Sequence, residues 1–112
     1  MTTALSRILD HLRDDGGLQR KDVANIVAVS PATVLRWSNG NARPDLPTQT
    51  VIADLCYVVD RLADFYMPEE TRLWLHAEHP MLGGDRAIDL INAGRTEPVL
   101  AIIEGLDSGA YT

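Results

Sequence analysis

Residues 20–40 constrain the fold more than any other part of the chain, because their apolar and turn residues suit two short helices that cross steeply. Ser30 is a preferred N-cap residue, and Pro31 follows at the first helical position, where its missing N–H is not needed. Asn39-Gly40 supplies a residue that tolerates the left-handed conformation at a helix end. The stretch therefore predicts a helix-turn-helix whose second helix starts at Ser30-Pro31.

The interior of this motif is also predictable from side-chain size and spacing. Ala24 offers a small side chain where the two helices approach most closely, and Val27 and Val29 are expected to cover the apolar floor. Val34 and Trp37 are three residues apart, so both face inward from the second helix. The alternative interpretation is a plain helical hairpin, because such residues at helical spacing often form core and nothing else.

This register resembles the helix-turn-helix of Xre- and Cro-type regulators, which commonly end in Arg-Trp-x-x-Gly, as Arg36 to Gly40 does here. That family often has Gly in the turn where this chain has Ala28. A left-handed conformation there would cost alanine roughly 1 kcal/mol, so we expect a slightly reshaped turn.

Because Val34 and Trp37 are expected to face inward, the opposite face of the second helix is expected to face DNA. Arg36 points outward and is the best candidate to contact a guanine edge, and Thr33 could contact a thymine methyl or a phosphate. The alternative for Arg36 is a solvated arginine. Arg20 and Lys21 fit phosphate contacts better than base contacts. The predicted DNA-binding residues are Arg20, Lys21, Ser30, Ala32, Thr33, Arg36 and Arg43.

Charge is distributed unevenly along the chain. Residues 1–44 carry six basic and four acidic side chains, whereas residues 45–112 carry four basic and twelve acidic ones. Phosphate would repel the acidic part, yet the amino-terminal part can still present a basic face to DNA. With so few cations in each copy, we expect a homodimer that binds a repeated or palindromic operator, with steep salt dependence.

The remaining residues predict an all-α protein without strands. We expect three segments: a helix-turn-helix domain at 1–46, a connecting or dimerising helix at 47–66, and a small helical domain at 67–112. The first helix should cover about residues 3–14, and residues 41–47 should form a proline-rich connector. Later helices should begin at the N-cap residues Thr48, Asp85 and Thr96, and one should begin with Pro68. The long helix after Thr48 is expected to extend to Tyr66.

Catalysis, cofactors and metals are not expected. Cys56 is the single cysteine; it falls on the apolar side of a helix, so we interpret it as a small buried hydrophobe. A catalytic thiol would need a base nearby, and none is visible in the sequence. His11, His76 and His79 are scattered, and a metal site needs further ligands. No Gly-rich phosphate loop or nucleophile elbow is present. No apolar run approaches the roughly 20 residues of a membrane span, so we expect a cytoplasmic protein.

The carboxy-terminal half carries a second resemblance. Its pattern comprises Trp74-Leu75, Pro80-x-Leu82-Gly83-Gly84, Ala87-x-Asp89-Leu90-Ile91, Gly94, Val99-Leu100-x-x-Ile103, Leu106, Gly109 and Tyr111. Together these residues resemble the toxin-binding domain of the Xre/MbcA/ParS antitoxin family. With the preceding helix-turn-helix, the likeness covers nearly the whole chain.

This resemblance implies a bacterial type II antitoxin that neutralises a RES-domain, NAD-consuming toxin, forms a higher hetero-oligomer with it and represses its own operon. The tail would lie near the entrance of the toxin's active site, with Tyr111 as an anchor or packed on its own domain, and the acidic half would suit a basic cleft. The implied toxin-binding residues are Pro80, Leu82, Gly83, Gly84, Asp85, Gly109, Tyr111 and Thr112.

Two other functions stay open at this point. One is a stand-alone helix-turn-helix transcription regulator without a toxin partner. The other is a protein adaptor whose helix-turn-helix no longer binds DNA, which the weak basic balance of residues 1–44 allows.

Overall fold

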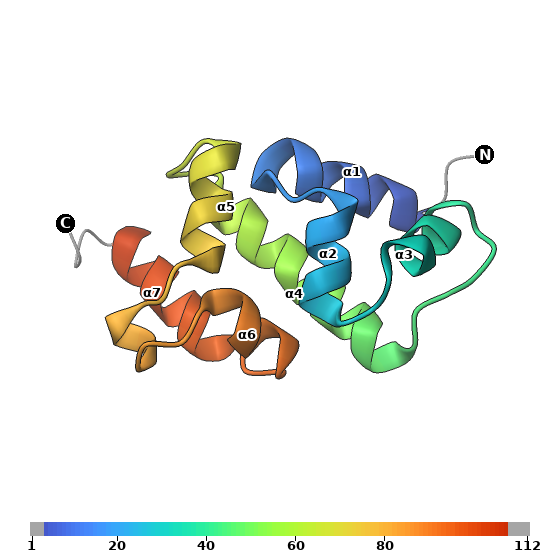
Figure 1. Ribbon diagram of the computed structural model, residues 1–112. Coiled ribbons are helices and arrows are strands. Elements are labelled where there is room, and N and C mark those ends of the chain that lie inside the picture. The colour runs from blue at the N-terminus through green and yellow to red at the C-terminus, as the bar shows by residue number, and fades with distance from the viewer. Residues whose placement is uncertain (1–3, 108–112) are drawn as a thin grey trace.

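A computed structural model describes residues 4–107 of the chain, and these residues form helices without any strand (Figure 1). One isolated bridge joins Glu78 and Arg86. None of the described helices combines the length and apolar character needed to cross a membrane. The helices are α1 (Ala4–Gly16), α2 (Arg20–Val27), α3 (Pro31–Ser38), α4 (Leu46–Leu62), α5 (Pro68–His76), the short 3₁₀ helix η1 (Pro80–Leu82), α6 (Ala87–Asn92) and α7 (Glu97–Asp107). The predicted all-α fold is confirmed.

Helix α4 is the central element of the molecule. It contacts α1, α2, α6 and α7, and in Figure 1 it runs between α3 at one end and α7 at the other. Its buried side chains recur at three- and four-residue steps, which places them on the faces turned toward these neighbours. They are Val51, Ile52, Leu55, Val58, Val59 and Leu62.

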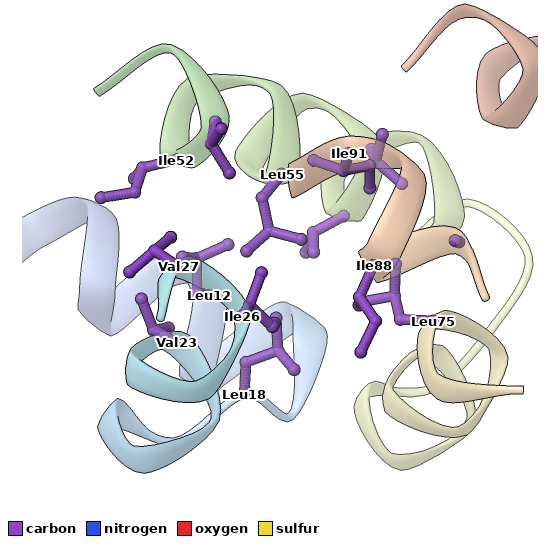
Figure 2. Close-up of a cluster of buried hydrophobic side chains, with 14 of the residues drawn as sticks. Leu12, Leu18, Val23, Ile26, Val27, Ile52, Leu55, Leu75, Ile88 and Ile91 are labelled. Carbon is purple, nitrogen blue, oxygen red and sulfur yellow. The ribbon is translucent and has the colours of Figure 1, made fainter. Parts of the chain in front are cut away.

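One hydrophobic core joins helices from all three predicted segments. Figure 2 shows Leu12, Ile26, Leu55, Leu75 and Ile91 converging from α1, α2, α4, α5 and α6. Each of these side chains is nearly or fully removed from solvent. The division at 46/47 and 66/67 therefore does not divide the core, and it stays a prediction about separate roles.

The start of α4 differs from the prediction. Asp45, rather than Thr48, is the N-cap residue, and its Oδ1 accepts a hydrogen bond of 2.9 Å from the Thr48 N–H. Proline fits the first turn of a helix because that turn's N–H groups have no partner in the helix, so Pro47 belongs to α4 and not to the connector. The helix also ends at Leu62, and Tyr66 lies beyond it.

The starts of α6 and α7 also differ from the predicted caps. Asp85 does not cap α6: the N-cap residue is Arg86, without a side-chain cap bond. Thr96 directly precedes α7 as expected, but its hydroxyl donates to Asp54 Oδ2 on α4 at 2.9 Å. The side chain of Thr96 thus ties the start of α7 to the central helix.

Cys56 lies in a different environment from the one expected. Its side chain is half-buried rather than buried, and it lies close to His11 of α1. The fold therefore brings beside this thiol an imidazole that could act as a base. This proximity is not visible in the sequence, because His11 and Cys56 belong to different helices.

Candidate functional site

The connection between α2 and α3 is a tight turn with one unusual residue. Ala28 adopts φ 61° and ψ 45°, the left-handed conformation that glycine favours. The Val29 N–H donates to the Ala24 carbonyl at 2.9 Å across this turn. The turn is therefore kept in its left-handed form with alanine in place, and the expectation that it would be reshaped was wrong.

The start and the inner face of α3 agree with the sequence. Ser30 is the N-cap residue, and its Oγ accepts from the Thr33 N–H at 3.1 Å. Trp37 is only 5% exposed, and Val34 and Ala24 are fully buried. The predicted N-cap and inward-facing side chains are confirmed.

The outer face of α3 is the first candidate site, and we call Ala32, Thr33, Leu35 and Arg36 the α3 surface. Ala32, Leu35 and Arg36 are exposed and Thr33 is half-buried. Arg36 Nη2 donates to Thr33 Oγ1 at 3.3 Å, and Thr33 Oγ1 also shares a 2.9 Å hydrogen bond with Ser30 Oγ. This network holds the Arg36 guanidinium along the exposed face of α3, toward its amino-terminal end.

Leu35 is a member of this surface that the sequence reasoning missed. Its side chain is 54% exposed, which is unusual for a large apolar residue on a short helix. The signal was present in the spacing: once Val34 and Trp37 are assigned to the interior, Leu35 falls outside their stripe.

The basic residues near α3 have different surroundings. Lys21 and Arg43 are exposed. Arg20 is half-buried: its Nε donates to Ser38 Oγ at 3.1 Å, and its Nη2 lies 3.5 Å from Asp10 Oδ1. Arg20 therefore links α2 to α1 and α3, so a phosphate would have to share this guanidinium with Asp10.

The second candidate site is the exposed segment of residues 80–85, which we call the 80–85 loop. Pro80, Gly83, Gly84 and Asp85 are exposed, whereas Leu82 is 8% exposed and belongs to the core. Gly83 and Gly84 have φ values of 71° and 88°, which glycine adopts without strain. Leu82 therefore anchors the loop from inside, and the other five residues, Met81 among them, form its surface.

Hydrogen bonds fix this loop to α5 and to itself. The Gly84 N–H donates to the His79 carbonyl at 2.9 Å, and the His79 N–H donates to the Asp85 carbonyl at 3.1 Å. The His79 ring donates from Nε2 to the Trp74 carbonyl at 2.8 Å, and the two rings lie 4.4 Å apart. The loop is thus a defined surface rather than a loose connection.

Met81 is the residue of this loop that the sequence reasoning missed. It is 56% exposed at the loop tip, between Pro80 and the buried Leu82. Gly109, Tyr111 and Thr112, the other predicted toxin-binding residues, lie outside the described residues.

Two acidic side chains of the carboxy-terminal half are paired within the chain. Arg86 donates twice to Asp89, at 2.8 and 3.0 Å, and these hydrogen bonds hold the pKa of Asp89 below its usual range. Asp107 lies 3.8 Å from Arg61 of α4. Part of the negative charge of this half is therefore balanced locally.

The two candidate sites lie at opposite ends of an elongated molecule measuring 44 × 24 × 18 Å. Helix α3 is at one end in Figure 1, and the 80–85 loop lies with α7, which η1 contacts, at the other. The structure thus defines an all-helical protein with one core and two separate candidate surfaces.

Comparisons with known proteins give the family. The probable mycobacterial cidal antitoxin Rv3188 of Mycobacterium tuberculosis is 36% identical over 106 residues, which cover 95% of this chain and 90% of that protein. The mycobacterial cidal antitoxin MbcA of Mycobacterium bovis and of M. tuberculosis is 30% identical over 95 residues, covering 85% of this chain and 84% of MbcA. No family model matches the chain.

A solved structure extends the likeness to three dimensions. A chain in the crystal structure of the M. tuberculosis MbcT-MbcA toxin-antitoxin complex matches with a TM-score of 0.83 and 26% identity, covering 98% of this chain and 99% of that chain. The similarity spans both candidate surfaces and the core between them. The protein belongs to the MbcA family of antitoxins.

Proposed function

We propose that this antitoxin neutralises a toxin encoded beside it by binding the toxin through its carboxy-terminal half. The observation that carries the proposal is the match to a chain of the MbcT-MbcA complex, which covers 98% of this chain at a TM-score of 0.83. The match includes α5, η1, α6 and α7 as well as the amino-terminal helices, whereas an unrelated helix-turn-helix regulator would be expected to match in the amino-terminal helices alone. We further propose that the toxin has the RES fold and consumes NAD, as the sequence resemblance implies.

The 80–85 loop is suited to bind this partner. Its hydrogen bonds through His79 hold it in one conformation, so little conformational entropy is lost on binding. Met81 is an exposed, flexible apolar side chain that can fill an irregular pocket. Pro80, Gly83, Gly84 and Asp85 would surround it, and Leu82 would hold the loop from the core.

The charge of the carboxy-terminal half supports the same assignment. Residues 45–112 carry twelve acidic and four basic side chains. A toxin that admits the phosphates of NAD needs a basic cleft, and opposite potentials speed association and orient the partners. Asp85 of the 80–85 loop would then face this cleft.

We also propose that α2 and α3 form a helix-turn-helix that binds operator DNA. Helix α3 would enter the major groove, with Arg36 toward a guanine edge and Leu35 toward thymine methyl groups. Lys21 and Arg43 would contact phosphates, and Arg20 would do so while it still orders the start of α2. Because each chain offers few cations, two copies on a repeated site would be needed for tight binding.

Co-expression with the product of the adjacent reading frame tests the toxin proposal. With an affinity tag on that product, we expect the chain to co-purify in a fixed ratio and the loss of cellular NAD to stop. Met81→Glu should weaken capture, because a charge would replace the apolar tip of the loop. Met67→Glu is the matched control, since Met67 is also exposed but lies at the start of α5.

Two results would contradict toxin binding by the 80–85 loop. If both proteins are folded and elute separately, or if Met81→Glu and Met67→Glu are captured as well as the unmodified chain, the 80–85 loop does not bind the toxin. Separate elution together with operator binding would identify a stand-alone transcription regulator instead.

A further inference from the structure

Four side chains with metal-binding chemistry meet where α1 packs on α4. His11 and Asp15 are four residues apart on α1, and Cys56 and Asp60 are four residues apart on α4. Residues at this spacing lie on the same face of a helix, one turn apart. Since α1 and α4 are in contact, the two pairs face each other across the helix junction.

The donor atoms converge closely. One ring nitrogen of His11, Cys56 Sγ and a carboxylate oxygen of Asp60 all lie within 4.8 Å of one another. His11 Nε2 is in contact with Asp60 Oδ1. Ligands at about 2.0–2.3 Å from a zinc ion are themselves roughly 3–4 Å apart, so small side-chain adjustments would bring all three into one coordination sphere.

We propose that His11, Cys56 and Asp60 bind a divalent transition-metal ion of the zinc type, which would clasp α1 to α4. An imidazole nitrogen, a thiolate and a carboxylate oxygen are the three protein ligand types that zinc accepts. The thiolate disfavours hard cations such as Mg²⁺ and Ca²⁺, which prefer oxygen ligands. Water would fill the fourth position of the tetrahedron.

The second ring nitrogen of His11 is already positioned for this role. His11 Nδ1 lies 3.1 Å from Asp15 Oδ2, so the carboxylate can accept a hydrogen bond from Nδ1–H. That tautomer leaves the Nε2 lone pair directed toward Asp60 and Cys56. A carboxylate behind a metal-binding histidine is a recurrent arrangement, because it fixes the ring and strengthens the ligand. Asp15 is therefore a positioning residue.

Charge and access also favour a cation at this junction. Asp15 and Asp60 place two carboxylates around the His11 ring beside Cys56, and such a group of oxygen donors attracts a cation. His11 is 33% exposed and Asp60 more so, which gives an ion a path from solvent. The junction lies outside both the α3 surface and the 80–85 loop, so the proposal does not depend on the proposed function.

The competing explanation is a protonated His11 that bridges Asp15 and Asp60 without any metal. Cobalt(II) distinguishes the two, because a thiolate ligand gives an intense charge-transfer absorption that a histidine or carboxylate cannot give. We expect the chelator-treated full-length chain to bind one equivalent of Co²⁺ with this absorption, and one equivalent of Zn²⁺ to remove it.

Substitutions locate the site. Cys56→Ser should abolish the charge-transfer absorption, and His11→Gln and Asp60→Asn should each weaken Co²⁺ binding by on the order of tenfold or more. Asp64→Asn is the matched control, since Asp64 is an exposed carboxylate one turn further along the chain from Asp60. It should bind Co²⁺ as the unmodified chain does, and so should His76→Gln.

Thermal unfolding gives an independent measurement. Because the ion would bind only the folded chain, Zn²⁺ should raise the Tm of the unmodified protein and of Asp64→Asn, and Mg²⁺ should not. Cys56→Ser, checked for native helicity by circular dichroism, should lose this rise. Absence of the charge-transfer absorption, its persistence in Cys56→Ser, or an equal loss in Asp64→Asn would overturn the proposal, and the first result would leave the protonated His11 bridge.

Discussion

Ala28 carries the clearest local strain in the described part of the chain. Within residues 4–107 it is the only residue other than glycine with a positive φ. The left-handed conformation brings Cβ of an L-residue too close to the following carbonyl oxygen, at a cost of about 1–2 kcal/mol. The motif therefore keeps its turn geometry against the preference of the residue that occupies it.

Ala28→Gly should accordingly raise the free energy of unfolding by about 1 kcal/mol, because glycine adopts φ 61° without strain. Urea denaturation of both proteins measures the difference. Ala101→Gly is the control: Ala101 is exposed within α7, where glycine should lower stability by about 1 kcal/mol. Equal losses in the two variants would contradict the strain at Ala28.

Residue-scale features were predictable where neighbours in sequence decide them. Ser30 was predicted as the N-cap and Trp37 as buried, since both follow from positions within one turn of helix. Leu35 and Met81 were missed: both are exposed, and neither is among the residues predicted to bind DNA or toxin. Periodicity alone can mark Leu35 as outward-facing, whereas the exposure of Met81 depends on the path of the loop.

At the scale of elements, the loop after α1 is fitted closely against α5. Gly17 has φ +64°, and a Cβ at this position would lie 2.7 Å from the Pro68 carbonyl oxygen. That oxygen belongs to backbone at the start of α5 and cannot rotate away. A side chain here would therefore separate the end of α1 from α5.

Gly17→Ala should lower the free energy of unfolding by about 2–3 kcal/mol, combining backbone strain with the steric conflict. Gly94→Ala tests the strain alone, because Gly94 has φ +77° and no atom within 4 Å of the added Cβ. Gly94→Ala should lower the free energy of unfolding by only about 1 kcal/mol. Thermal or urea unfolding of the two variants gives the comparison, and losses of equal size would show that the contact with Pro68 contributes nothing.

Element positions were predictable from periodicity, but several boundaries were not. Asp45 and Thr48 are both good N-cap residues, and Pro44 and Pro47 favoured a connector. The hydrogen bond from the Thr48 N–H to Asp45 decides the choice, and Pro47 fits because the first turn needs no donor from it. For Thr96, Asp54 of α4 accepts the hydrogen bond from the hydroxyl, a contact that sequence spacing does not indicate.

At the scale of the whole molecule, Asp22 joins the amino-terminal helices to the carboxy-terminal half. Its carboxylate accepts from the Gln19 N–H at 2.9 Å and from Arg72 Nη2 of α5 at 3.1 Å. Burial acts to raise the pKa of Asp22, but the hydrogen bonds from Arg72 and Gln19 outweigh it, and the net pKa lies below the usual value.

A lowered pKa in the folded state means that the ionised form stabilises the fold. This stabilisation is present above pH of about 4, the usual carboxyl range, and is lost as the pH falls through the lower folded-state value. Asp22→Asn should lower the free energy of unfolding by about 1–2 kcal/mol at pH 7 and by less in acid. Urea denaturation at both pH values tests this, and a deficit that does not shrink in acid would contradict it.

Contacts at this scale could not be predicted from the sequence. Asp22 and Arg72 are 50 residues apart, and His11 and Asp60 are 49 residues apart. Periodicity indicates which side chains of a helix face inward, but not which helices become neighbours. The shared core across the three predicted segments and the meeting of His11 with Cys56 both depend on that pairing.

The separation of the two surfaces can be measured on a single variant. Arg36→Ala removes the guanidinium from the α3 surface without touching the core, since the side chain is exposed and, within residues 4–107, its guanidinium hydrogen-bonds to Thr33 alone. Removing a base-contacting arginine typically lowers the free energy of DNA binding by about 1–3 kcal/mol. The affinity for the chain's own promoter, measured by gel shift, should therefore fall roughly tenfold or more. Arg13→Ala, an exposed arginine on α1, removes the same charge elsewhere and serves as the control.

We expect Arg36→Ala to lose operator binding while it still captures the toxin in full, and Arg13→Ala to retain both. If Arg36→Ala binds the operator like the unmodified chain, or loses operator and toxin together, one core does not carry two independent functional surfaces.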